Sequence, residues 1–241
     1  MFSSETGAST RETYTTDDFT YTLIDEYSKV QILSYIGSDT DVVIPDRIDN
    51  KKVTSIADSA FREKSITSVV FGQYVESIGN YAFYSCRSLS KLDFSKSSVK
   101  TIGDYAFTVC KSLESIEFPE SLESIGYAAF SAYTNCYRGS YVASSLKSVK
   151  FGGGLKSIES YAFYENRALN TVKFTGDALT SIGYRSFYNT DITELDLSGA
   201  NASIGTYAFY SCNSLRTVKL SGVNTIESGA FYGCDELVNL E

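Results

Sequence analysis

The side chains that could carry chemistry in this 241-residue chain are five cysteines, 19 tyrosines and 29 carboxylates, and there is no histidine. A Ser–His or Cys–His nucleophile pair and a histidine-containing zinc site are therefore excluded. The cysteines have no C-x-x-C spacing, and the glycines at 152–154 lack the flanking residues of a phosphate-binding loop. The carboxylates are scattered, with no pair that implies a cleft for acid–base work. The sequence predicts a protein that is not an enzyme, with no catalytic residue, no cofactor and no metal site.

Four of the five cysteines share one sequence position, three residues after a phenylalanine: Cys86, Cys110, Cys212 and Cys234. Other copies of this position carry Lys64, Tyr133, Asn166 and Thr190. We expect a side chain here to point inward and to meet backbone groups that a turn leaves unpaired. Buried free thiols are predicted, although cysteines of neighbouring copies could come within disulfide range in an oxidising location. Cys136 breaks the pattern and is a candidate exposed thiol.

These cysteines belong to a repeat in which isoleucine stands five residues before phenylalanine. Eight copies are present: Ile56/Phe61, Ile78/Phe83, Ile102/Phe107, Ile125/Phe130, Ile158/Phe163, Ile182/Phe187, Ile204/Phe209 and Ile226/Phe231. By subtraction, the steps between phenylalanines are 22, 24, 23, 33, 24, 22 and 22 residues. All but one fall within the range of about 20–29 residues typical of leucine-rich repeats. Most copies continue with an alternating apolar segment, such as Leu92 and Phe94, which predicts a short strand with one buried face.

The repeat predicts the fold, because one short unit cannot by itself offset the conformational entropy lost when its chain is ordered. Stacked units would bury their Ile, Ala and Phe side chains in one continuous core. We expect a leucine-rich-repeat solenoid, right-handed, of about eight repeats of 22–24 residues. One face would be a parallel β-sheet, and the other would hold short strands, turns or helical turns. The array would cover residues 53–241 with an insertion at 131–145, after a flexible segment at 1–18.

Three copies of the repeat resemble the BspA-like leucine-rich repeats of bacterial and protist surface proteins. They are Ile-Gly-Asn-Tyr-Ala-Phe-Tyr-Ser-Cys at 78–86, Ile-Gly-Asp-Tyr-Ala-Phe-Thr-Val-Cys at 102–110 and Ile-Gly-Thr-Tyr-Ala-Phe-Tyr-Ser-Cys at 204–212. The segment from Phe19 to Pro45 resembles the strands that lead into such arrays, and this implies an N-terminal β cap at 19–52. The resemblance also implies an extracellular or cell-surface location and a role in adhesion.

Charged side chains should form columns on the solvent side of the predicted sheet, where most leucine-rich repeats bind their ligands. The candidate contacts are Asp93, Glu117, Lys150, Lys173, Asp196 and Lys219. Acidic residues precede basic ones along the array, so charge complementarity could orient a polar ligand. The alternative is that these side chains only keep the surface soluble.

Tyrosines and the insertion supply the other candidate contacts. Tyrosine recurs one residue after the repeated Phe and two residues before it: Tyr84, Tyr164, Tyr188, Tyr210 and Tyr232, and Tyr81, Tyr105, Tyr161 and Tyr207. Stacked coils would turn these into stripes suited to protein recognition or sugar stacking, or the rings merely cover the neighbouring coil. The insertion carries Tyr133, Tyr137, Arg138 and Tyr141, and either binds directly or is a tolerated spacer loop.

The net charge of −8 argues against binding to nucleic acid, and no apolar run is long enough for membrane insertion. The leading hypothesis is an exported protein-binding module of the adhesin type. Its partner would be a host matrix or cell-surface protein or another microbial surface protein. A structural spacer and a carbohydrate-binding module are the alternatives. The last coil has no polar closing element, so an edge-to-edge homodimer is also expected to be possible.

Overall fold

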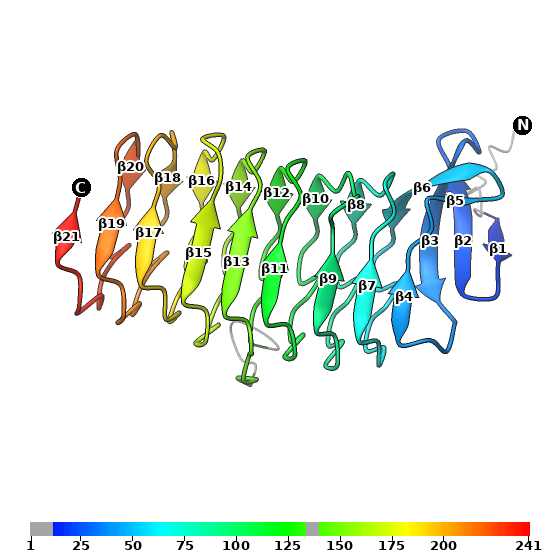
Figure 1. Cartoon of the computed structure of the whole chain (residues 1–241), viewed down its shortest axis with the longest axis horizontal. Helices are drawn as coiled ribbons and strands as arrows, with labels where there is room; N and C mark the ends of the chain where they lie inside the picture. Colours follow the sequence, from blue (N-terminus) through cyan, green and yellow to red (C-terminus); the bar gives the residue numbers. More distant parts are fainter. Residues whose placement is uncertain (1–11, 134–139) are drawn as a thin grey trace, which may run out of the picture.

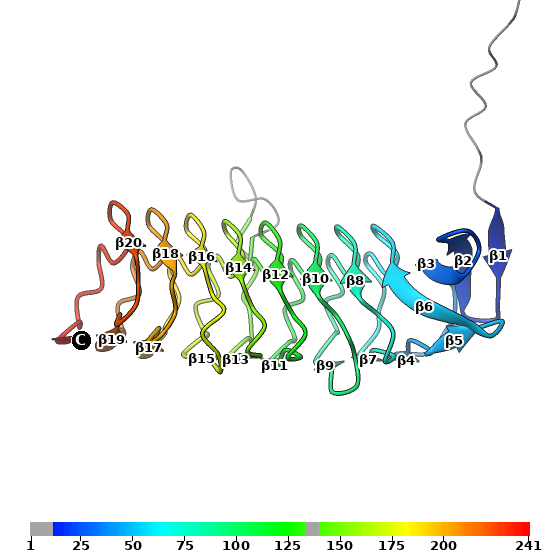
Figure 2. The ribbon, with the colours of Figure 1, turned by 90° about the horizontal axis from the view of Figure 1, so that it is seen from above.

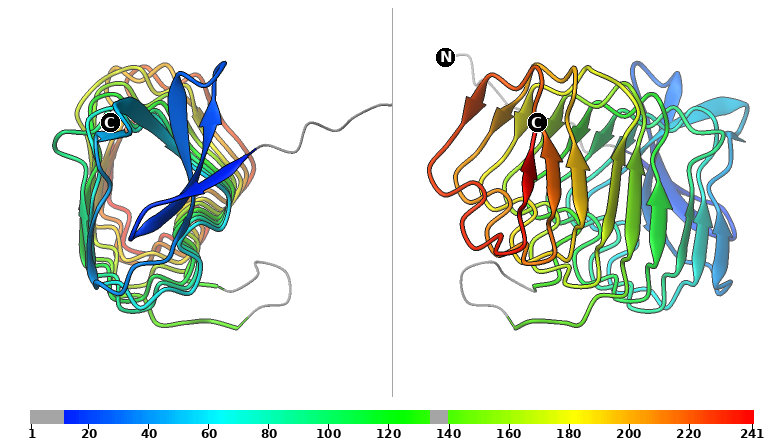
Figure 3. Two further views of the ribbon diagram at one scale, coloured as in Figure 1. Left: turned by 90° about the vertical axis from the view of Figure 1, so that its right-hand side faces the viewer. Right: turned by 60° about the vertical axis from the view of Figure 1, so that its left-hand side comes forward.

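Coils stacked one on another make up most of the molecule, with a group of N-terminal strands at one end (Figure 1). This computed structural model describes residues 12–133 and 140–241. Successive coils lie side by side along the long axis (Figure 2), and viewed along that axis they share nearly one outline (Figure 3). The predicted leucine-rich-repeat solenoid is confirmed, with about nine turns where eight repeats were predicted.

The N-terminal strands continue directly into the array. Antiparallel β1 (Thr13–Thr15), β2 (Phe19–Ile24) and β3 (Lys29–Tyr35) are followed by β6 (Lys51–Ile56), which pairs in parallel with β3 and antiparallel with β5 (Arg47–Ile48). β6 then pairs in parallel with the first short strand of the array. Backbone hydrogen bonding therefore passes without interruption from the predicted cap at 19–52 into the coils. Of the predicted flexible segment at 1–18, residues 1–11 lie outside the described residues.

One long face consists of two-residue parallel strands that each place Ser or Thr outward and Ile inward. They are β8 (Ser77–Ile78), β10 (Thr101–Ile102), β12 (Ser124–Ile125), β14 (Ser157–Ile158), β16 (Ser181–Ile182), β18 (Ser203–Ile204) and β20 (Thr225–Ile226). The isoleucine of the repeat is buried in every one of these strands except β20. We call this surface the Ser-Ile face.

The opposite surface, the strand face, carries one strand per coil. Its members are β4 (Asp41–Val43), β7 (Ser68–Val70), β9 (Lys91–Asp93), β11 (Ser115–Glu117), β13 (Ser148–Phe151), β15 (Thr171–Phe174), β17 (Glu194–Asp196), β19 (Thr217–Lys219) and β21 (Asn239–Leu240). They are parallel, as predicted, but they form three separate sheets, β4-β7-β9, β11-β13-β15 and β17-β19-β21. Hydrogen bonding is therefore interrupted between β9 and β11 and again between β15 and β17.

Each interruption follows a turn that is one or two residues longer than those of the other coils. Eight residues separate Phe94 from Ile102 and Phe174 from Ile182, whereas the corresponding steps elsewhere in the array are seven or six residues. The longer turn displaces the end of its strand from the next coil. The rings of Phe94 and Phe118, across the first interruption, are 6.0 Å apart, against 4.5 Å for Phe71 and Phe94 within a sheet. A count of turn residues thus accounts for both breaks.

The remaining side of each coil is built from tight turns, and no helix occurs in the described residues. The helical turns expected here were therefore wrong. Residues two before and two after the repeated Phe have left-handed backbones, and a single left-handed residue ends any α-helical turn. The first set, with φ between 51° and 65°, is Ser59, Tyr81, Tyr105, Ala128, Tyr161, Arg185, Tyr207 and Gly229. The second, with φ between 55° and 75°, is Glu63, Ser85, Val109, Glu165, Asn189, Ser211 and Gly233. Across residues 12–133 and 140–241, no helix could span a membrane.

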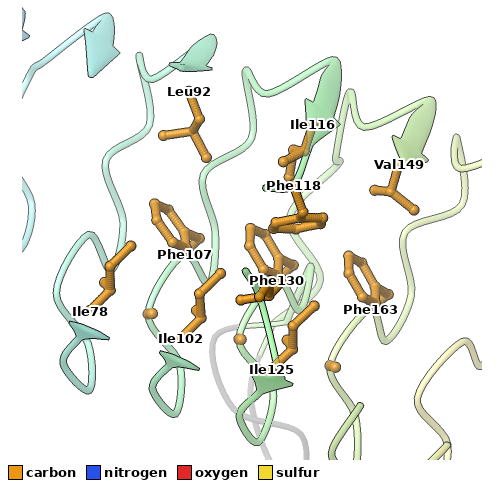
Figure 4. Close-up of a cluster of buried hydrophobic side chains, with 14 of the residues drawn as sticks. Ile78, Leu92, Ile102, Phe107, Ile116, Phe118, Ile125, Phe130, Val149 and Phe163 are labelled. Carbon is orange, nitrogen blue, oxygen red and sulfur yellow. The ribbon is translucent and has the colours of Figure 1, made fainter. Parts of the chain in front are cut away.

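The core lies between these walls as a continuous stack of phenylalanine rings. Figure 4 shows Phe107, Phe130 and Phe163 between the isoleucines of the Ser-Ile face and the apolar residues of the strand face. Successive rings of the repeat lie 4.7 to 5.3 Å apart and within 14° of parallel. Burying one such side chain contributes about 1.5–3 kcal/mol, so each coil stabilises the coil on either side.

Candidate binding surfaces

The position three residues after the repeated Phe has the inward role that was predicted. In five coils its side chain donates a hydrogen bond to the carbonyl of the Phe in the preceding coil, as in Cys86 Sγ to Phe61 O at 3.0 Å and Asn166 Nδ2 to Phe130 O at 2.8 Å. Thr190 instead donates to the carbonyl of Phe187 in its own coil. Cys86, Cys110, Cys212 and Cys234 are buried free thiols, also as predicted. The candidate exposed thiol, Cys136, lies outside the described residues.

Burial makes most of these thiols poor nucleophiles. It raises the pKa of Cys86 to about 12 and the pKa values of Cys110 and Cys212 well above the ordinary range. A hydrogen bond from Cys212 instead lowers the pKa of Cys234. The four buried cysteines and Asn166, which make the same hydrogen bond between coils, form what we call the spine of the array. Among these cysteines, Cys234 in the last coil is the most reactive.

Four of the six charged residues predicted on the strand face form ion pairs between coils. Glu117 and Lys150 lie directly opposite each other on β11 and β13, and their side chains are hydrogen bonded. On β17 and β19, Asp196 and Lys219 are likewise opposite, with 3.6 Å between Oδ2 and Nζ. A ligand that used these side chains would have to compete with their existing partners.

The other two predicted charges on the strand face differ. Asp93 accepts a 3.0 Å hydrogen bond from the amide of Ser95, and the hydrogen bonds from Ser95 lower the pKa of its carboxyl. Lys173 is exposed, and within the described ranges 12–133 and 140–241 no carboxylate pairs with it. It follows Lys150 on the neighbouring strand, so two like charges stand side by side.

Lys173 borders an open groove at the second interruption of the strand face. The groove lies between β15 and β17 and has a volume of about 880 Å³. Its rims carry Lys173, Glu194 and Asp196, and Leu197 is one of its apolar lining residues. Phe174 is only half-buried here, whereas its counterparts Phe71, Phe94, Phe118 and Phe151 are buried. This groove was not predicted, although the extra residue in the preceding turn is visible in the sequence.

Tyrosines form a continuous row along the side of the coils that is built from tight turns. Ring centres of Tyr81, Tyr105, Tyr127, Tyr161, Tyr184 and Tyr207 follow one another at 4.9 to 6.2 Å. Four of these tyrosines were predicted, and two were missed. Tyr127 and Tyr184 stand three residues before the Phe instead of two, yet their rings fill the gaps in the row.

A second row runs beside the first and reaches the insertion. Tyr164, Tyr188, Tyr210 and Tyr232 stack with ring centres 5.0 to 5.2 Å apart, and exposure rises from 8% at Tyr164 to 66% at Tyr232. Tyr161 and Tyr164 join the two rows at 5.2 Å. We call the two rows together the tyrosine face. Burial raises the pKa of Tyr164 to about 12, so its hydroxyl stays protonated at neutral pH.

The insertion extends the tyrosine face. Tyr133 pairs antiparallel with Tyr141 at the base of the insertion, and the ring of Tyr133 packs edge-on against Tyr164 at 5.5 Å. The guanidinium of Arg167 lies 4.5 Å from the centre of the Tyr141 ring. The structure thus brings two predicted insertion residues, Tyr133 and Tyr141, together with the tyrosine rows. The other two, Tyr137 and Arg138, lie outside the described residues.

One cation on the tyrosine face was not predicted. Arg185 occupies a position that is tyrosine in four other coils, and its guanidinium lies 5.0, 5.3 and 5.5 Å from the rings of Tyr184, Tyr188 and Tyr207. Its Nε is buried and has no hydrogen-bond partner among residues 12–133 and 140–241. Arg185 was not predicted because it replaces the tyrosine that repeats at this position.

The edge of the last coil is also exposed. β21 pairs only with β19, and Ile226, Tyr232, Val238 and Leu240 are each at least half exposed. The predicted edge-to-edge homodimer stays a prediction.

The sequence was compared with families and with known proteins. A model described as "BspA type Leucine rich repeat region (6 copies)" matches residues 40–138 and 134–241. A leucine-rich-repeat protein of T. pallidum is similar over 94% of this chain and 91% of its own, with 25% sequence identity and a TM-score of 0.70. A leucine-rich-repeat protein from Bacteroides capillosus shares 26% identity over 57% of this chain and 96% of its own, with a TM-score of 0.46. A search of curated proteins found no match.

Proposed function

This chain belongs to the BspA-type leucine-rich-repeat family, and on that premise we propose that it is an extracellular or surface-exposed module that binds another protein through its tyrosine face. Leucine-rich-repeat proteins are in general protein-interaction modules without enzymatic activity. The proposal adds to this general role an adhesin-type partner, a location outside the cell and a particular surface.

The observation that carries the proposal is the continuity of the tyrosine face. Two rows of rings and the base of the insertion meet around Tyr161 and Tyr164, which are buried and anchor the rows, and around half-buried Tyr133. Tyrosine and arginine are the residues most enriched where protein interfaces concentrate their binding energy, because they offer large contact area with few rotatable bonds. The strand face supports binding less, because its opposite charges already satisfy each other.

The stacking geometry favours a protein over a sugar as the partner. In the second row, the rings of Tyr188 and Tyr210 lie 2° from parallel, so each ring covers the face of its neighbour. A sugar stacks on an open ring face, whereas a protein surface can use ring edges and hydroxyl groups. Of the second-row rings, Tyr232 is the most exposed.

The proposal can be tested with a panel of immobilised extracellular-matrix proteins, host cell-surface proteins and glycans. Binding of the intact chain is compared with that of a variant lacking residues 133–142. The proposal expects saturable binding to a protein that weakens in the variant, while circular dichroism shows unchanged coils. Binding of the intact chain to glycans alone, or to no member of a broad panel, would count against it.

A further inference from the structure

We infer that Arg185 is an anchor for the carboxylate of an aspartate or glutamate side chain on the partner protein. The inference rests on the proposed function and names the chemistry by which the tyrosine face would recognise its partner.

The first argument is the unused hydrogen-bonding capacity of Arg185. A guanidinium has five N–H donors and no acceptor, and it prefers a planar, bidentate acceptor such as a carboxylate. In the described part of the chain, no carboxylate lies within ion-pair distance of Arg185, and its buried Nε donates to nothing. Three tyrosine rings hold the group in place without satisfying its donors.

Glu165, the carboxylate that lies with Arg185 near Tyr164 and Tyr188, is engaged elsewhere. Glu165 has a nearly buried side chain, and its Oε2 lies 2.7 Å from Nε of Arg167. The same oxygen accepts a 2.9 Å hydrogen bond from the amide of Asn189. Arg167 neutralises Glu165, so Arg185 is left with an uncompensated positive charge on this part of the surface.

The surroundings favour a protein side chain over a free anion. The rings of Tyr184, Tyr188 and Tyr207 all lie within 5.5 Å of the guanidinium and restrict its movement, so little freedom is lost when a ligand binds. The same rings offer apolar contact to the segment that would carry the carboxylate. The rest of the chain has an excess of acidic residues, with a net charge of −8, and would repel an acidic partner that was not docked at this position.

The test uses a phage-displayed library of random peptides of one length, selected on the immobilised full chain. Selection is run in parallel on Arg185→Tyr and Arg185→Glu. Arg185→Tyr is expected to fold, because tyrosine occupies this left-handed position in Tyr81, Tyr105, Tyr161 and Tyr207. Lys96→Gln is the control, since it also removes one positive charge, from an exposed turn with no ion pair recorded in the described ranges.

Peptides selected on the wild-type chain should share an aspartate or glutamate at a fixed position and bind Arg185→Tyr about tenfold or more weakly. They should bind Lys96→Gln as they bind the wild type. Replacing the shared acid with Asn or Gln should weaken binding to the wild type but leave binding to Arg185→Tyr unchanged. Arg185→Glu should select peptides with lysine or arginine at that position instead.

Two results would overturn the inference in distinguishable ways. If the selected peptides carry no shared acid, or bind Arg185→Tyr as well as the wild type, the role of Arg185 is lost but the tyrosine face can still bind protein. If the peptides instead lose affinity for strand-face variants and not for tyrosine-face variants, the proposed function fails together with the inference.

Discussion

The side-chain amide of Asn166 donates a 2.8 Å hydrogen bond to the backbone carbonyl of Phe130 in the preceding coil. The four cysteines at the same position donate the same bond, so the donor to this carbonyl is a thiol in four coils and an amide in one. Asn166 also accepts a 2.6 Å hydrogen bond from Ser144, at the end of the insertion. It therefore ties the insertion to the spine of the array.

Asn166→Ala should destabilise the protein by about 1–3 kcal/mol, because it leaves the buried carbonyl of Phe130 without a donor. Asn166→Cys should cost less, since a thiol makes this bond in four other coils. Chemical denaturation of the two variants checks the order of stability. Equal destabilisation by both substitutions would show that the bond to Phe130 contributes little.

Ser186→Ala should stabilise the protein by about 1 kcal/mol and raise Tm by about 2–4 °C. The hydroxyl of Ser186 is fully buried and has no hydrogen-bond partner in the part of the chain that the structure describes, and the other seven repeats carry alanine at this position. Differential scanning calorimetry measures the change. An unchanged or lower Tm would mean that the hydroxyl has a partner in solution, such as a bound water.

Alkylation at about pH 8.5, the ordinary pKa of a thiol, should modify Cys234 before the other cysteines of the spine. A hydrogen bond from Cys212 lowers the pKa of Cys234, whereas burial raises the pKa of Cys86 to about 12. Because the pKa of Cys86 is higher in the folded than in the unfolded state, the folded protein favours the protonated thiol. This contribution to the free energy of unfolding is fully present below the unfolded-state pKa and is lost as pH rises toward about 12. Mass spectrometry of alkylated peptides gives the order, and early modification of Cys86 would contradict the account.

Deleting Asp177 should rejoin two of the sheets on the strand face. The deletion shortens the turn after β15 to the length found in coils whose strands pair. The amide of Phe174 should then donate to the carbonyl of Asp196, as Phe118 donates to Lys150 at 2.9 Å. Hydrogen exchange should show new protection at Phe174. Unchanged exchange there would mean that turn length is not the cause of the interruption.

Sequence spacing was sufficient to predict the coils, because the buried residues of a solenoid must recur at one place in every coil. It also predicted the inward role of Cys86 and Asn166, since a narrow turn forces that position toward the core. The helical turns were wrong because backbone handedness at Tyr81 and Ser85 cannot be read from side-chain type.

The binding surfaces were harder to predict, because they depend on register between coils. Glu117 and Lys150 are 33 residues apart, and they lie opposite each other because they hold the same repeat position in the coils on either side of the insertion. Tyr127 and Tyr184 lie one residue before the expected position in the repeat, yet their rings belong to the row. Arg185 stands where four other coils have tyrosine. Departures from the repeat, and not the repeat itself, therefore mark the surface most suited to a specific partner.

The central claim is that the tyrosine face, and not the charged strand face, binds the partner. Surface plasmon resonance with a protein ligand from the binding panel tests it on two double variants, Tyr188→Ser with Tyr210→Ser and Glu117→Gln with Lys150→Gln. The Glu117–Lys150 ion pair is solvent-exposed and contributes little to stability, so the second variant should fold and serves as a control for surface changes. We predict that affinity falls about tenfold or more in the tyrosine variant and is unchanged in the charge variant. Loss of affinity in the charge variant alone would contradict the account and move the binding site to the strand face.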